Sequence, residues 1–217
     1  MNLRQGFVLT RHWRDTPAGT YVEFWLATDN GPQRLSLPYQ TSIGFIPVEQ
    51  RELAEPLLRD EQGVELRELE LADFRHRTVL GLYCSQYRQL RYLDKRLRAA
   101  GIAVYEADIR PPERYLMERF ITAPVCFGGV VQADGSVHEP RMNPAPGYRP
   151  HLRLVSLDIE TDARGALYSI GLEGCGERQV YMLGPKNGSD AAVDFKLDYC
   201  DSRGQLIERL NDWFPRH

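Results

Sequence analysis

A proline-rich segment constrains the organisation of this chain more than any other feature of the sequence. Residues 141–150, RMNPAPGYRP, contain three prolines and a glycine. Because proline cannot donate an amide hydrogen bond, it disrupts helix interiors and central strands. We therefore predict an irregular joint between two domains, residues 1–147 and 148–217.

The first domain carries mostly strand and turn signals. The segments 6–13, 21–27, 34–37, 43–46 and 125–131 predict strands, and Asp29-Asn30-Gly31-Pro32 predicts a hairpin turn because Asn-Gly accepts positive φ. Residues 48–58 and 110–120 predict helices. A strand at 78–84, a helix at 87–100 and a strand at 102–105 predict a ferredoxin-like element.

One face of the predicted helix at 87–100 is basic. Arg88, Arg91, Lys95 and Arg98 recur at helical spacing, opposite an apolar face of leucines. Such a stripe is either a solvated face or a track for DNA phosphates. The formal charge of −3 for the whole chain does not favour nucleic acid, although a local basic face can be hidden in that average.

The second domain is predicted to contain strands at 152–159, 166–172 and 179–183, then a loop at 184–190, a short extended stretch, and a helix from Ser202 to residue 214. Residues 173–177, EGCGE, predict a hairpin turn. Ser202 is the expected N-cap of the last helix.

An acidic pair ends the first strand of the second domain. Asp158 and Glu160 are two residues apart, so on a strand their side chains point to the same face, with Cα atoms roughly 6.5–7 Å apart. A divalent cation would offset their repulsion, and two cations could activate water for phosphodiester cleavage. On spacing alone, a metal site and a solvated strand end are both open.

Several segments resemble the family B DNA polymerases of the bacterial DNA polymerase II type. VSLDIET is similar to the first exonuclease motif of that family, and VYEADIRPPERYLMERFI is similar to its N-terminal-domain signature. GFVLTRHWRDTPAGTYVEFWLATDNGP and LYSIGLEGCGERQVYMLGP resemble the DNA polymerase II branch in particular. The resemblance covers nearly the whole chain.

The resemblance implies an α+β protein. A mixed β and ferredoxin-like N-terminal domain would help to hold the single-stranded template, and a truncated ribonuclease-H-like exonuclease domain would follow it. Asp158 and Glu160 would bind Mg²⁺ or Mn²⁺, and Thr161 would lie at a backbone contact to the terminal nucleotide. The whole protein would extend DNA from deoxynucleoside triphosphates and excise mismatched 3′ ends in replication and repair.

The sequence departs from the family in ways that predict an inactive fragment. The family's asparagine-x-x-x-phenylalanine-aspartate, tyrosine-x-x-x-aspartate and D-T-D motifs are absent from these 217 residues. We therefore expect no polymerase activity and little or no exonuclease activity from this chain. The strand that bears Asp158 would have an unpaired apolar edge, which predicts self-association.

Composition and cysteine spacing place the chain in a broad class. With 42% hydrophobic and 26% charged residues, no apolar leader and no membrane span, a cytoplasmic protein is predicted. Four widely spaced cysteines are expected to be reduced core thiols.

Two other functions stay open at this point. One is a stand-alone, non-catalytic protein that binds single-stranded nucleic acid. The other is an unrelated phosphodiesterase that adds His138 or His151 to the acidic pair.

Overall fold

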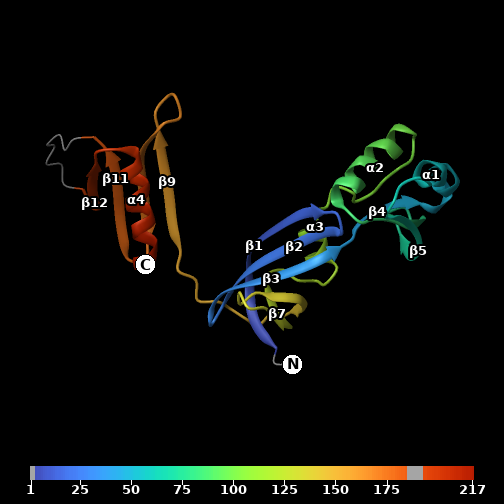
Figure 1. The fold of residues 1–217 in the computed structure, drawn as a ribbon, viewed down its shortest axis with the longest axis horizontal. Helices are drawn as coiled ribbons and strands as arrows, with labels where there is room; N and C mark the ends of the chain where they lie inside the picture. Colours follow the sequence, from blue (N-terminus) through green and yellow to red (C-terminus); the bar gives the residue numbers. More distant parts are fainter. Residues whose placement is uncertain (1–2, 185–192) are drawn as a thin grey trace. The chain divides into compact units, whose positions relative to one another are not determined.

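The structure is a computed structural model that describes residues 3–184 and 193–217 (Figure 1). The chain divides into two compact units, Met1–Pro150 and His151–His217, so the division falls at the end of the proline-rich segment. We call them unit 1 and unit 2. Both combine sheets with a few helices, which confirms the α+β class.

Unit 1 contains a closed five-stranded barrel in the order β1-β2-β3-β8-β7. Neighbouring strands are antiparallel except β3 and β8, which are parallel and pair at Leu35–Val137 and Ser36–His138. The predicted hairpin turn at Asp29 and Asn30 joins β2 to β3. The barrel is filled by large buried side chains, among them Phe24, Leu26, Leu35 and Phe127. The strands are β1 (Arg4–Thr16), β2 (Gly19–Thr28), β3 (Gly31–Gln40), β7 (Pro124–Val131) and β8 (Val137–Pro144).

The prediction for residues 141–150 was partly wrong, because residues 141–144 belong to strand β8. Strand β8 tolerates Pro140 and Pro144 because it pairs with β3 at only two positions, which leaves most of its amides free of a ladder on that side. Helix α3 (Pro111–Met117) packs on β1 and β2 and ends three residues before the predicted position. It begins with two prolines, which suit the first turn of a helix.

Unit 1 also contains a separate antiparallel sheet in the order β4-β6-β5, covered by α2. Helix α2 directs Leu90, Leu93 and Leu97 into a core with Leu80 and Leu82 of β6. Strand β5 was not predicted, and only three of its nine residues are partly buried. The elements are β4 (Ser42–Pro47), η1 (Val48–Gln50), α1 (Arg51–Leu58), β5 (Val64–Ala72), β6 (Thr78–Cys84) and α2 (Tyr87–Ala99).

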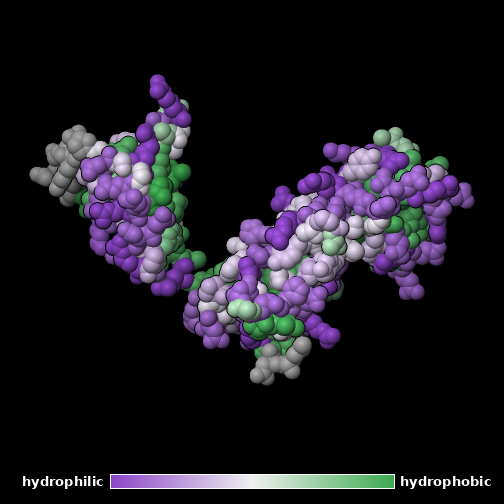
Figure 2. Space-filling model, in the orientation of Figure 1, coloured by the Kyte–Doolittle hydropathy of each residue, from purple (hydrophilic) through white to green (hydrophobic). Residues whose placement is uncertain are grey.

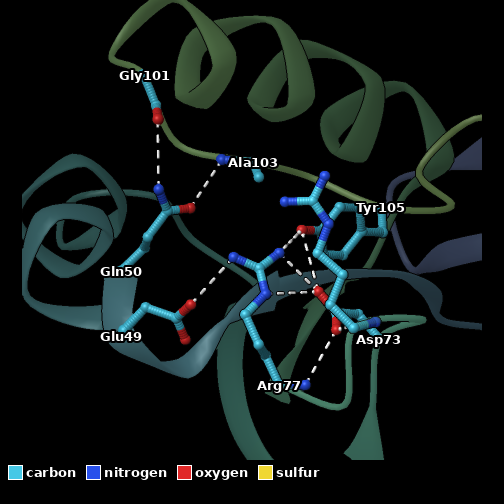
Figure 3. A network of polar contacts seen from close by, with 8 residues as sticks. Glu49, Gln50, Asp73, Arg77, Gly101, Ala103 and Tyr105 are labelled. Carbon is cyan, nitrogen blue, oxygen red and sulfur yellow. Dashed lines mark hydrogen bonds and ion pairs between the residues drawn. The ribbon is translucent and has the colours of Figure 1, made fainter.

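The strand predicted at 102–105 was wrong, and side-chain contacts hold this segment instead. Its one bridge joins Tyr105 to Phe45 of β4. Figure 3 shows the other contacts: Gln50 accepts from the amide of Ala103 at 2.8 Å, and Arg77 donates to the Tyr105 hydroxyl at 2.7 Å. Because these contacts replace a sheet ladder, the element is not a complete ferredoxin-like strand-helix-strand.

Unit 2 is a four-stranded sheet in the order β12-β11-β10-β9, and helix α4 packs on β10, β11 and β12. The predicted hairpin turn is confirmed at Cys175 and Gly176, and Ser202 is confirmed as N-cap because its hydroxyl accepts from the Gln205 amide. The predicted loop falls mainly on residues outside the described part of the chain. The elements are β9 (Val155–Thr161), β10 (Leu167–Gly174), β11 (Glu177–Leu183), β12 (Lys196–Cys200), α4 (Arg203–Trp213) and η2 (Phe214–Arg216).

The four cysteines are free, but they are not all core residues. Cys84 and Cys200 are buried, and burial raises the pKa of the Cys84 thiol to about 12. Cys126 is half-buried, and Cys175 is exposed because it lies in the hairpin turn. The expectation of core thiols was therefore wrong for Cys175.

Candidate metal and nucleic-acid sites

The predicted metal ligands lie on strand β9, at one edge of the unit 2 sheet. In the register with β10, Asp158 lies opposite Gly171 and Glu160 lies opposite Ser169. Both carboxylate residues are exposed. The pleat directs them to one face, while Leu157 and Ile159 point to the face on which α4 lies.

The surface beside Asp158 is an open hollow on that acidic face. Gly171 forms part of its floor, where a Cβ atom would meet nothing within 4 Å. Arg178 also lines it and is held by two carboxylates, Asp194 at 2.5 Å and Glu173 at 3.0 Å. The Arg178 guanidinium is therefore already neutralised, and the free charged group on the walls of the hollow is the Asp158 carboxylate of β9, which suits a metal ion.

The donor set fits Mg²⁺ or Mn²⁺ in kind, because both cations prefer carboxylate oxygen. It is small, however. Among residues 3–184 and 193–217, no group of three or more His, Cys, Asp or Glu side chains is placed to hold a metal ion. One Asp158 oxygen also accepts a hydrogen bond from the Ile159 amide at 3.0 Å.

The other predicted residues near this site are placed as follows. Thr161 is the exposed last residue of β9, and the alternation of the strand directs its side chain away from the acidic face. His138 belongs to unit 1, where its Nδ1 lies 3.2 Å from the Ser36 hydroxyl. His151 is an exposed residue at the start of unit 2. Neither histidine, both of which lie in the described part of the chain, belongs to a group of side chains that could hold a metal ion.

The edge strand β9 presents apolar side chains that the described part of unit 2 leaves about half uncovered. Leu157 is 43% exposed and Ile159 is 52% exposed. Figure 2 shows hydrophobic residues (green) gathered along this strand. Within the described residues, β9 pairs only with β10, so its other edge leaves backbone groups without a ladder partner.

The predicted basic stripe lies on the outer side of α2, and its four members are not equivalent. Arg91 and Arg98 both pair with Asp94, at 3.3 Å and 2.5 Å, and the Asp94 side chain is only 9% exposed. For Arg88 and Lys95, by contrast, no ion pair is found among the described residues. The role of Asp94 was not predicted from the sequence, although its spacing of three and four residues from the two arginines is the signal for such pairs.

Comparison with known proteins shows which proteins have a similar sequence and a similar fold. Residues 6–41 match the family model "DNA polymerase II, N-terminal", and residues 42–102 match "DNA polymerase II, insertion domain". The chain is 57% identical to DNA polymerase II of Escherichia coli (strain K12) over 212 residues, which are 98% of this chain and 27% of that protein. Among solved structures, a family B DNA polymerase from the hyperthermophilic archaeon Pyrobaculum calidifontis superimposes with a TM-score of 0.65, covering 86% of this chain and 28% of that one at 18% identity.

The fold is therefore that of the amino-terminal region of a family B DNA polymerase. Within that class, the two domain models and the 57% identity confirm the resemblance to the bacterial DNA polymerase II branch. The chain spans about a quarter of the length of the curated relative that it matches. In the part of the chain that the structure describes, no helix is both long and apolar enough to cross a membrane.

Proposed function

We propose that this chain is the amino-terminal region of a DNA-directed DNA polymerase that also proofreads through a 3′→5′ exonuclease. The observation that carries the proposal is the 57% identity to DNA polymerase II over almost the whole chain. The placement of Asp158 and Glu160 on one exposed face of β9 supports the exonuclease part. Its partners would be template and primer DNA and deoxynucleoside triphosphates. It would act in replication and repair, in the cytoplasm.

In the proposed exonuclease, Asp158 and Glu160 hold divalent cations and Thr161 lies beside the terminal nucleotide. Bound Mg²⁺ or Mn²⁺ supplies the Lewis acidity that phosphodiester cleavage requires. The open floor at Gly171 leaves room for a substrate phosphate next to Asp158. Two exposed carboxylates hold Mg²⁺ poorly by themselves, since Mg²⁺ demands a near-octahedral shell and sheds water reluctantly.

It follows that the 217-residue chain alone has no polymerase activity and little or no exonuclease activity. The test incubates this chain with a 3′-labelled oligonucleotide and Mg²⁺ or Mn²⁺, beside Asp158→Ala. We expect no release of nucleotide above background from either. Metal-dependent release that Asp158→Ala abolishes would contradict the proposal.

The open edge of β9 further supports self-association of this chain at high concentration. Leu157 and Ile159 would be buried in an edge-to-edge contact that also pairs free backbone groups. Sedimentation velocity over a wide concentration range tests this part separately. A single monomeric species throughout would refute it.

A second candidate is a non-catalytic role in binding single-stranded nucleic acid. It is favoured by the cations of α2, where Arg88, Arg91, Lys95 and Arg98 share one side of the helix. This role needs no metal. Binding that weakens steeply with salt, in a chain without nuclease activity, would support it.

A further inference from the structure

Helix α2 carries an exposed aromatic side chain within its basic side. Tyr92 is 56% exposed, although most of the large apolar side chains of this helix are buried. It lies four residues after Arg88 and three before Lys95, so both are its neighbours on the helix surface. Among the described residues, no hydrogen bond to the Tyr92 hydroxyl is found. The ring is thus available to a ligand.

The charges around Tyr92 are predominantly positive. Arg88 and Lys95 are exposed on either side of the ring, and within the described residues neither has an ion-pair partner. Arg96, four residues after Tyr92, is paired with Glu61 at 2.6 Å. The single acidic residue of this helix, Asp94, is buried and is shared by Arg91 and Arg98. The surface next to Tyr92 therefore favours an anion.

The helix that carries the ring is anchored before any ligand arrives. The Asp15 carboxylate accepts from the amides of Tyr87 and Arg88 at 3.0 and 2.9 Å, which anchors the first turn of α2. The opposite face is held by Leu93 and the other buried leucines of the sheet core. A ring on an anchored helix is ordered at low cost when a ligand binds.

We infer that Tyr92 is a stacking platform for an unpaired base of single-stranded DNA, with Arg88 and Lys95 contacting the phosphates on either side. This inference rests on the proposed function, because it takes the DNA of that function as the ligand. Aromatic rings set in a cationic track are the recurring means of binding single strands without sequence preference.

Another exposed aromatic residue of unit 1 provides the contrast. Phe74 is fully exposed in the turn between β5 and β6, but its flanking Asp73 and Arg77 pair with each other at 2.6 Å. Glu49 also pairs with Arg77. Arg75 is the one cation of this turn for which no ion pair is found among the described residues. Phe74 therefore lacks the two free cations that flank Tyr92, and we expect it to contribute less to DNA binding.

The test measures fluorescence anisotropy of two labelled ligands with the 217-residue chain: a dT 16-mer and an abasic strand of the same length. Tyr92→Ala is expected to weaken binding of the dT strand about 5- to 150-fold, as expected for loss of one stacked base. Binding of the abasic strand and the salt slope should not change. Tyr92→Phe should retain wild-type affinity, and Phe74→Ala is the matched control.

Lys95→Gln should affect the phosphate contacts and leave base stacking unchanged. It should lower the slope of log affinity against log salt by about 0.7 and weaken both ligands equally. If Tyr92→Ala leaves dT binding unchanged, or weakens both ligands alike, the stacking inference is wrong while the proposed function stands. If the unaltered chain binds neither ligand, template binding itself fails. Tyr92→Gln gives an independent check should the alanine variant fold poorly.

Discussion

Replacing Asp94 with asparagine tests whether this residue restrains the basic side of α2. The carboxylate is 9% exposed and accepts from Arg91 and Arg98, whose side chains are 38% and 56% exposed. Because the arginines reach water, screening reduces what the pairs contribute, and we expect Asp94→Asn to lower the free energy of unfolding by only about 1 kcal/mol. A domain of this size should then melt roughly 2–4 °C lower.

The same substitution should strengthen DNA binding. It removes the negative charge beneath the stripe and releases Arg91 for a phosphate, whereas Arg98 also donates to the Val104 carbonyl oxygen. For a single strand, each added phosphate contact steepens the salt slope by about 0.7, which at 0.1 M salt corresponds to roughly 5-fold in affinity. One released arginine therefore predicts about 5-fold tighter binding.

The assay pairs thermal unfolding with anisotropy of a labelled dT strand at several salt concentrations. Glu55→Gln is the matched control, because it changes the net charge equally but outside the stripe, where Arg51 of α1 keeps its ion pair with Glu68. The reasoning is refuted if Asp94→Asn lowers stability without raising affinity. It is also refuted if Glu55→Gln raises affinity as much as Asp94→Asn does.

Three further predictions concern local structure. Gly174 has φ +152°, and a Cβ there would lie 2.3 Å from the Leu154 carbonyl oxygen. Gly174→Ala should therefore speed hydrogen exchange throughout unit 2 but not in unit 1. Gly171→Ala, where a Cβ meets nothing within 4 Å, should leave hydrogen exchange nearly unchanged. Hydrogen bonds from the backbone and then the side chain of Arg77 lower the pKa of Asp73 from 3.8 to about 2. The contribution of the ionised Asp73 to the free energy of unfolding is present above pH 3.8 and is lost as the pH falls towards 2. The urea midpoints of wild type and Asp73→Asn should therefore differ at about pH 6 and converge between pH 3.8 and 2. Finally, Ile159→Lys should abolish the predicted self-association in sedimentation velocity without lowering the melting temperature, because Ile159 is half-exposed on an edge strand.

Local signals in the sequence predicted the elements that local interactions determine. The leucine spacing of α2, the Asn30-Gly31 turn and the Ser202 cap each depend on residues within a few positions, and each is confirmed. The acidic pair was likewise predicted on a strand, because the apolar residues Leu157 and Ile159 that identify the strand are its immediate neighbours in the sequence. These features follow from side-chain periodicity and capping.

Long-range pairing accounts for what the sequence did not predict. Strand β5 is an edge strand with charged residues on both faces, so it has no apolar alternation strong enough to identify it. The parallel closure of the barrel between β3 and β8 joins residues about a hundred positions apart, and it makes a strand of a segment that its prolines disfavour. The stripe on α2 was visible in the sequence, but its division into paired and free cations depends on the burial of Asp94.

The central proposal is that this chain belongs to a larger polymerase that proofreads through Asp158 and Glu160. The most direct test determines the size of the gene product by sequencing past codon 217, and assays that product for Mg²⁺-dependent excision of mismatched 3′ ends. The account predicts a frame that continues into the asparagine-x-x-x-phenylalanine-aspartate and D-T-D motifs, with excision lost in Asp158→Ala while primer extension remains. A stop codon directly after His217, or excision that survives Asp158→Ala, would contradict it.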